Sequence, residues 1–238
     1  MEPARRVCWA EGMGVEQVVA ELAGTGFRQA HFGDAGLFAD PGRGTALCRL
    51  MAERGVNILW SARIDAVPDS ELLRAMRLAG CQRVLLPSAG AVAGEVRDRL
   101  RAFGFDYAVT RPDGATSTPE RAAYTVAERE AVAERLPGLH AVQFDLAVAY
   151  FKARRFEEVM RPLGKAMALR FPANELCLNL LACLSAARHY PDVAAGLLAQ
   201  AGHAWPHPVV LRNRQLLRSW LESGGDVKGV RLMLEPEG

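Results

Sequence analysis

The stretch of sequence that decides the fold runs from residue 57 to residue 90 and reads NILWSARIDAVPDSELLRAMRLAGCQRVLLPSAG. A short apolar segment at its start is typical of a buried strand. Pro68 and the capping side chains after it begin a helix, and Gly80 ends that helix because an achiral residue adopts the left-handed conformation without strain. Residues 84–86 form a second buried strand. A strand, a helix and a strand within about 30 residues predict a βαβ unit with parallel strands.

The same alternation extends in both directions from this unit. Amphipathic segments predict helices at residues 15–23, 45–54 and 95–103, and apolar segments predict strands at residues 27–32 and 105–109. A glycine lies between each helix and the next strand, at Gly26, Gly55, Gly80 and Gly104. This spacing of roughly 25 to 30 residues is the length of one βα unit, so we expect about four parallel strands with covering helices. The periodicity alone is equally typical of a barrel and of a doubly wound open sheet.

Residues 1 to about 118 resemble the middle of a radical SAM enzyme barrel, of the kind often attached to a cobalamin-binding domain. The similar segments are residues 15–22, Gly33-Asp34, residues 60–65 and residues 71–81. The resemblance implies an α/β fold that is a partial, open TIM-type barrel over residues 1–117. It also implies that a complete enzyme of this kind would bind S-adenosylmethionine and a 4Fe-4S cluster.

The chain departs from that family where the cluster would be bound. The family's cluster-binding cysteines lie in a loop that would precede the start of this chain, and Cys8 alone cannot replace three thiolate ligands. Ala89 and Ala115 stand where the family has glutamates after two of its strands. We therefore expect no catalytic residue, no metal ligand and no cofactor in this chain. S-adenosylmethionine and a 4Fe-4S cluster are expected only if the chain is part of a complete family enzyme.

The carboxyl ends of the predicted strands supply the candidate cofactor-binding residues, which are Gly33, Asp34, Arg63, Asp65 and Ser88. Ligands bind at this face of a parallel sheet in barrels and in open sheets alike. The alternative is ordinary loop polarity, because strand ends are exposed to water in most proteins. Arg63 and Asp34 are the strongest candidates, since the family resemblance and the expected geometry agree on them.

The second half of the chain contains helical patterns and no strand pattern. A helix is expected from Thr118 to about Leu136, where Pro137-Gly138 breaks it. A repeat with a shift of 34 residues follows, and it pairs Phe156 with Tyr190, Leu163 with Leu197 and Phe171 with Trp205. This period and the segment 146–159 resemble the tetratricopeptide repeat, in which stacked helical hairpins supply a core that no single hairpin can bury.

Three segments therefore make up the expected organisation. Residues 1–117 form the partial barrel, residues 118–234 form an all-α domain of tetratricopeptide-like repeats, and residues 235–238 form a disordered tail. A protein partner is expected to bind through the repeats and through the open edge of the sheet, whose backbone groups lack a neighbouring strand.

A basic groove is one way in which such repeats would recognise a partner. Arginines occur in the repeat region at Arg154, Arg155, Arg212, Arg214 and Arg218. Guanidinium groups suit carboxylates, so these residues would accept an acidic peptide. The alternative is a solvated helix surface with no ligand.

The composition excludes several other functions. Half of the 238 residues are hydrophobic, and the formal net charge of +2 is too small to favour nucleic acid or an anionic membrane. The apolar runs are far shorter than the roughly 20 residues of a membrane-spanning helix. The five cysteines include no CxxC pair, and scattered thiols of this kind fit the reducing cytoplasm.

Two functions remain open. In the first, the chain is a truncated or degenerate radical SAM-family protein, a pseudoenzyme whose helical repeats bind another protein. In the second, it is part of an active radical SAM enzyme that cleaves S-adenosylmethionine with a cluster held by other sequence. The sequence does not define a substrate, a partner or an oligomeric state.

Overall fold

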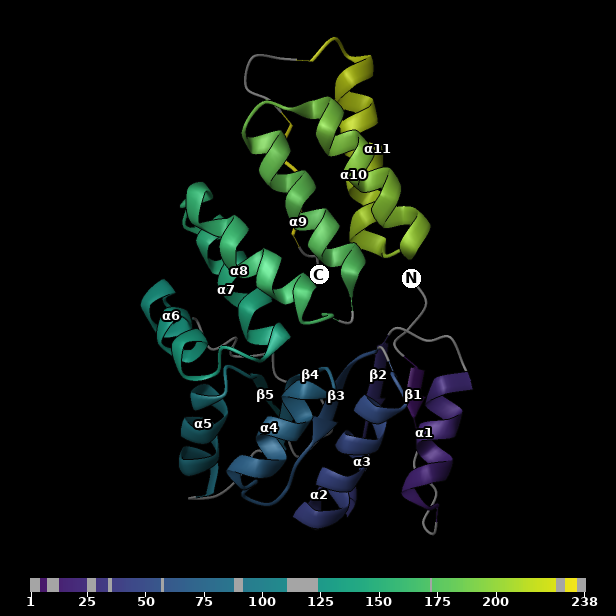
Figure 1. Ribbon diagram of the computed structural model, residues 1–238, viewed down its shortest axis with the longest axis vertical. Coiled ribbons are helices and arrows are strands. Elements are labelled where there is room, and N and C mark those ends of the chain that lie inside the picture. The colour runs from purple at the N-terminus through teal and green to yellow at the C-terminus, as the bar shows by residue number, and fades with distance from the viewer. Residues whose placement is uncertain are drawn as a thin grey trace. The chain divides into compact units, whose positions relative to one another are not determined.

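The computed structural model describes residues 5–7, 13–24, 29–33, 36–56, 58–87, 92–110, 124–171, 173–225 and 230–234 (Figure 1). The chain divides into two compact units, Glu2–Gln143 and Phe144–Gly238, and the division falls inside helix α7 (His140–Lys152). The first unit contains a parallel sheet with helices, and the second is helical. The predicted change from α/β to all-α structure along the chain is therefore confirmed. The tail predicted for residues 235–238 lies outside the described residues.

The sheet of the first unit has five strands in the described part of the chain. They are β1 (Arg5–Val7), β2 (Gln29–Phe32), β3 (Leu59–Arg63), β4 (Cys81–Pro87) and β5 (Asp106–Thr110). All neighbouring strands are parallel, and their order in the sheet is their order in the chain. Strands β2 to β5 are the four predicted strands. β1 was not predicted, because three residues that include two arginines carry no apolar pattern.

The helices of this unit alternate with the strands. They are α1 (Val15–Gly24), α2 (Gly36–Ala39), α3 (Pro41–Glu53), α4 (Ser70–Leu78), α5 (Val92–Ala102) and α6 (Val126–Arg135). Helix α3 begins four residues before its predicted start because the Asp40 carboxylate accepts a 2.9 Å hydrogen bond from the Gly42 N–H, and Pro41 follows this cap. The short helix α2 was not predicted.

The glycines at the helix ends have the conformation that the sequence indicates. Gly55, Gly80 and Gly104 follow α3, α4 and α5 with φ values of 64°, 94° and 71°. After α5, the Phe105 N–H reaches back to the Leu100 carbonyl at 3.0 Å, which satisfies a carbonyl that the helix leaves unpaired. The chain then turns directly into the next strand. Gly26 lies outside the described residues.

A single apolar core joins these helices to one face of the sheet. Ala30, Phe32, Trp60, Ala62 and Val84 belong to the same buried cluster as residues of all five helices from α1 to α5. Successive side chains of a strand point to opposite faces, so these strand residues define the face that the helices cover. Helices α1, α3 and α4 lie side by side in front of the strands in Figure 1.

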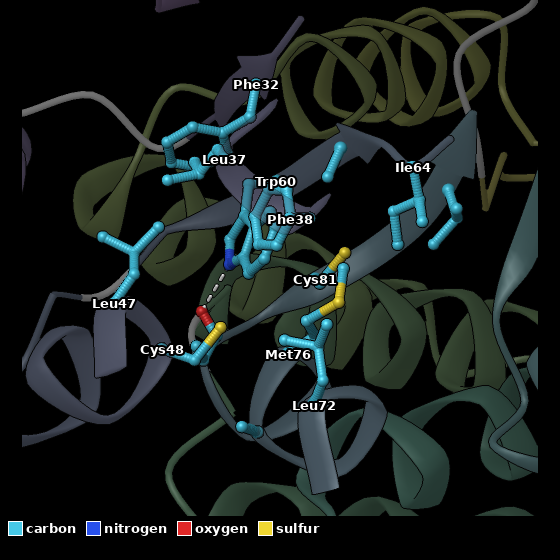
Figure 2. Close-up of a cluster of buried hydrophobic side chains, with 14 of the residues drawn as sticks. Phe32, Leu37, Phe38, Leu47, Cys48, Trp60, Ile64, Leu72, Met76 and Cys81 are labelled. Atoms are coloured by element: carbon cyan, nitrogen blue, oxygen red, sulfur yellow. Dashed lines mark hydrogen bonds between the residues drawn. The ribbon is translucent and has the colours of Figure 1, made fainter. Parts of the chain in front are cut away.

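Trp60 is at the centre of this core. Its ring lies 5.1 Å from the Phe32 ring and 5.7 Å from the Phe38 ring, and its indole N–H donates a 2.7 Å hydrogen bond to the Ala79 carbonyl (Figure 2). Phe38 comes from α2 and Ala79 from the end of α4. One side chain therefore connects two strands and two helices.

Helix α6 belongs to the sheet unit, although the sequence assigned its residues to the repeats. It begins at Val126 rather than at Thr118, because Thr125 and Glu128 form a capping box. Arg129 donates to the Gly104 carbonyl at 2.9 Å, and the Glu128 carboxylate lies 2.7 Å from Arg101 of α5. Residues 111–123, which include the predicted start of this helix, lie outside the described residues.

The second unit contains the rest of α7 and four further helices. They are α8 (Phe156–Ala168), α9 (Asn174–Ala187), α10 (Pro191–Ala204) and α11 (Pro208–Glu222). Left-handed residues follow four of these helices, at Arg154, Arg170, His189 and Gly224, and those after α7, α9 and α11 lie 35 residues apart. A non-helical segment, residues 230–234, contributes Leu232 to the core of α9, α10 and α11. No helix in the described part of the chain is long and apolar enough to span a membrane.

Candidate functional site

The face of the sheet away from the helices carries a row of polar side chains. The strand register pairs His31 with Ser61, Ser61 with Arg83, and Arg83 with Asp106. Each of these residues alternates with a core residue on its own strand, so their side chains share the second face. The His31 Nδ1 lies 2.9 Å from the Ser61 hydroxyl, and Asp106 lies 3.5 Å from the Arg129 guanidinium. Two members of the row, His31 and Ser61, therefore contact each other, and Asp106 at the other end pairs with helix α6.

The predicted cofactor-binding residues lie at the carboxyl end of this sheet. Gly33 directly follows β2 and Arg63 ends β3, so they occupy equivalent places on neighbouring strands. Arg63 Nε and the Asp65 carboxylate form an ion pair at 3.0 Å, with side chains that are 43% and 40% exposed. An exposed pair of this kind adds little stability. Asp34 and Ser88 lie outside the described residues, so the structure brings together Gly33, Arg63 and Asp65 only.

The described thiols do not fit an iron–sulfur cluster. Cys48 and Cys81 are buried in the core of the sheet unit, while Cys177 and Cys183 are buried in the helical unit. Burial raises the pKa of Cys177 and of Cys183 to about 12, and it raises the pKa of Cys48 further. Cluster ligands must be thiolates, which such sites disfavour. Among the described residues, no three His, Cys, Asp or Glu side chains gather as a metal site would require; Cys8 lies outside these residues.

The helical unit contains an open groove with a volume of about 530 Å³. Its lining comes from the end of α7, from α11 and from the segment 230–234. The apolar part consists of Phe151, Leu216, Leu232, Met233 and Leu234, and the basic part consists of Lys152, Arg212 and Arg231. An apolar surface beside three cations can hold a ligand that combines aliphatic and acidic groups.

The structure selects one of the arginines that the sequence proposed for such a groove. Arg212 lines it, whereas Arg154, Arg155, Arg214 and Arg218 do not. Arg155 instead forms an ion pair with Glu158, and its guanidinium lies 4.6 Å from the centre of the Tyr150 ring. Lys152 and Arg231 were missed, because a single basic residue at a helix end or after the last repeat gives no pattern.

Two asparagines hold the backbone of the segment 230–234. Asn213 accepts a 2.7 Å hydrogen bond from the Met233 N–H and donates one of 2.7 Å to the Met233 carbonyl. Asn179 donates to the same carbonyl at 3.0 Å and accepts from the Asn213 amide at 2.7 Å. Both side chains are almost completely buried, at 1% and 0% exposure. The N–H and C=O of one residue point to the same side only in extended backbone, so Met233 is held as a strand residue would be.

The sequence contained one signal for this pair. Asn179 and Asn213 lie 34 residues apart, which is the shift that relates the repeats. Each occurs in an apolar stretch of its helix, where an amide requires hydrogen-bond partners. An identical amide at this 34-residue spacing, in apolar stretches of two helices, is therefore the sequence signal for the pair.

No family model matches the chain, and no curated protein or solved structure matches it. The resemblances to the radical SAM barrel and to the tetratricopeptide repeat therefore stay predictions.

Proposed function

We propose that this chain is a binding protein in which the helical unit captures an acidic, aliphatic peptide segment of another protein. The sheet unit is a partial barrel of radical SAM type that holds no cluster of its own. One observation carries the proposal: the groove places Lys152 and Arg212 beside the apolar surface of Phe151 and Leu216.

The helical architecture supports a peptide ligand. Helices α9, α10 and α11 pack on one another around a shared core, as neighbouring hairpins of a tetratricopeptide-like array would. Such arrays leave a continuous surface along one side, on which an extended chain contacts several hairpins. The 34-residue spacing of Asn179 and Asn213 is that of the tetratricopeptide repeat, and the residues that end α7, α9 and α11 have a similar spacing of 35 residues.

Charge reversal in the groove tests the proposal. A library of random linear peptides is selected on the immobilised full chain, and the binding of enriched peptides is measured by fluorescence anisotropy. We expect enrichment of peptides in which Asp or Glu lies close to an aliphatic residue. Arg212→Glu should weaken their binding about tenfold, because an attraction at the groove becomes a repulsion.

Arg218→Glu is the matched control, since Arg218 lies exposed on the same helix and does not line the groove. The two variants carry the same net charge, so long-range effects cancel in their comparison. Failure of the library to enrich any peptide, or equal binding by both variants, would contradict the proposal.

The second candidate function is a part in radical SAM chemistry, and the sheet topology favours it. The strands follow one another in sequential order, and α1 to α5 share a core on one face. A barrel segment has this arrangement, whereas a doubly wound sheet reverses its strand order and has helices on both faces. Gly33, Arg63 and Asp65 would then contact the amino-acid end of S-adenosylmethionine, whose carboxylate and ammonium match the Arg63–Asp65 pair.

Ligand-induced stabilisation distinguishes this candidate. A ligand that binds only the folded state raises the melting temperature. S-adenosylmethionine should therefore raise the Tm of the full chain, and Arg63→Ala should abolish the increase. Iron–sulfur absorbance after anaerobic reconstitution would overturn the view that the chain holds no cluster. The edges of the sheet, which are β1 and β5 in the described residues, stay a further predicted contact for a protein partner.

A further inference from the structure

The segment 230–234 is held by its backbone as well as by apolar side chains that pack on the core of α9, α10 and α11. Asn213 makes two hydrogen bonds and Asn179 makes one to the N–H and the carbonyl of Met233, and the Cys183 thiol lies 3.5 Å from the same carbonyl. Every residue except proline presents this N–H and C=O pair. The asparagines would therefore hold the backbone of a different extended peptide equally well.

We propose that Asn179 and Asn213 form the backbone-binding site for the partner peptide, and that residues 230–234 are an internal occupant which the peptide replaces. This inference rests on the proposed function and specifies how the peptide binds. The partner is an extended segment that adds to the helical unit by main-chain hydrogen bonds, as in strand addition to a sheet edge. Release of the internal occupant is then the step that regulates binding.

Charge makes the internal occupant a poor match for its own site. The segment contributes Arg231 to a groove that already contains Lys152 and Arg212. Like charges close together repel, whereas an acidic residue in the place of Arg231 would be attracted. The segment nevertheless stays bound, because a tethered occupant competes at an effective concentration on the order of millimolar.

These contacts define the peptide that the site prefers. It carries Asp or Glu in the place of Arg231, an aliphatic residue in the place of Leu232, and any residue with a free N–H in the place of Met233. The second requirement follows because Leu232 is only 8% exposed and packs in the core of α9, α10 and α11. The third follows from the bond between the Met233 N–H and Asn213.

A labelled peptide with the sequence of residues 230–234 and the substitution Arg231→Glu is the probe. Its affinity is measured by fluorescence anisotropy for three full-length chains: the wild type, Met233→Pro and Arg231→Glu. Met233→Pro removes the N–H that donates to Asn213 and so releases the internal segment. We expect it to bind the probe about tenfold more tightly than the wild type, and Arg231→Glu about tenfold more weakly.

A second probe keeps all side chains and carries an N-methyl group on the residue that corresponds to Met233. It cannot donate to Asn213, so its affinity for the Met233→Pro chain should fall at least tenfold. Equal binding of both probes would show that apolar contact alone holds the peptide and would overturn the role of the asparagines. Circular dichroism of the Met233→Pro chain verifies that the helices stay folded.

The outcomes distinguish failure of the proposed function from failure of the internal-occupant proposal. If library peptides bind in a manner that depends on Arg212, but the affinity of the probe is the same for all three chains, the proposed function stands and the internal occupant is only a structural cap. If neither the library nor the probe binds any folded chain, the proposed function fails and this inference fails with it. Unfolding of Met233→Pro, together with unaltered probe binding by Arg231→Glu, also contradicts the inference.

Discussion

Left-handed residues follow helices in both units, but in the helical unit only α11 is followed by a glycine, and three other helices are followed by Arg or His. In the sheet unit, Gly55, Gly80 and Gly104 have positive φ values, whereas Arg154, Arg170 and His189 have φ values of 59°, 59° and 64° in the helical unit. A left-handed residue other than glycine costs roughly 1–2 kcal/mol. The sheet unit therefore displays its boundaries in the sequence. The helix ends of the helical unit have fewer glycine signals in the sequence, so tertiary packing does more to define where these helices end.

The cores of the two units also differ in the polar groups that they bury. The core of the sheet unit is apolar around Trp60, whose indole N–H donates to the Ala79 carbonyl, and it also contains the buried guanidinium of Arg77, which lies 5.0 Å from the centre of the Phe105 ring. The core of the helical unit contains the buried amides of Asn179 and Asn213. Buried amides stabilise a fold only while all their partners are present, so they make the helical unit sensitive to what occupies the groove.

The largest expected effect tests the apolar core. Trp60→Ala removes the indole between Phe32 and Phe38 and leaves the Ala79 carbonyl without its donor. We expect the free energy of unfolding to fall by about 3–5 kcal/mol, from lost burial and the cavity that remains. Chemical denaturation measures the change. Leu78→Ala is the control, because Leu78 is 42% exposed on α4, and a loss there similar to that of Trp60→Ala would refute the central role of the indole.

The next effect tests the polar core. Asn213→Leu leaves the Met233 N–H and the Asn179 side-chain oxygen without the partners they have in the described structure. Unsatisfied buried polar groups are costly, so we expect a loss of about 2–4 kcal/mol in denaturation experiments. Asn174→Ala, at an exposed position that begins α9, should change stability by less than about 0.5 kcal/mol. A neutral Asn213→Leu would show that the amide network is dispensable.

Acid should destabilise both units, each through one buried histidine. Burial lowers the pKa of His140, whose Nε2 lies 3.2 Å from the Leu78 carbonyl, and burial also lowers the pKa of His207, whose Nδ1 accepts from the Val209 N–H. A folded pKa below the unfolded value means that the unfolded chain binds more protons. Stability is therefore complete above the ordinary histidine pKa of about 6.5 and is lost as pH falls through the folded values.

Substitution of each histidine by an amide tests whether that histidine causes the loss of stability in its own unit. His140→Gln and His207→Asn keep a hydrogen-bonding group and cannot be protonated in this range, and Asn is a good residue at the helix start that His207 occupies. Each should flatten part of the fall in stability between neutral and mildly acidic pH, as followed by thermal unfolding at several pH values. His203→Gln is the control at an exposed position. Unchanged pH profiles in both buried variants would contradict the assignment.

The smallest expected effect concerns the helix ends. His189→Gly relieves the left-handed strain at the end of α9, and the gain is partly offset by the greater freedom of glycine in the unfolded chain. We expect a net gain of about 0.5 kcal/mol. The reciprocal change Gly224→Ala, at the corresponding position after α11, should cost about 1 kcal/mol. Thermal unfolding measures both, and changes of the same sign would show that these positions are not equivalent.

The sequence predicted most of the sheet unit because its signals are local. Pro68 with Asp69, and Gly80 with the apolar residues that follow it, act within a few residues of themselves, and the structure places α4 and β4 where they indicate. Two short elements were not predicted. Strand β1 has three residues and helix α2 has four, which are too few to show a periodic pattern of apolar side chains. The assignment of α6 to the repeats differed from the structure because its partners, Gly104 and Arg101, precede it by more than twenty residues.

The candidate site was less accessible to prediction. Arg63 and Asp65 are two residues apart, so their proximity was visible in the sequence. Arg212 was among the proposed arginines, but nothing local connects it with Lys152 of α7 or with Arg231. The sequence by itself determined the change from βα units to an all-helical region, since side-chain periodicity and glycine positions depend on neighbouring residues. Only the tertiary structure decided that Asn179 and Asn213 hold Met233, because hydrogen bonds between distant residues form only when packing brings α9, α11 and the segment 230–234 together.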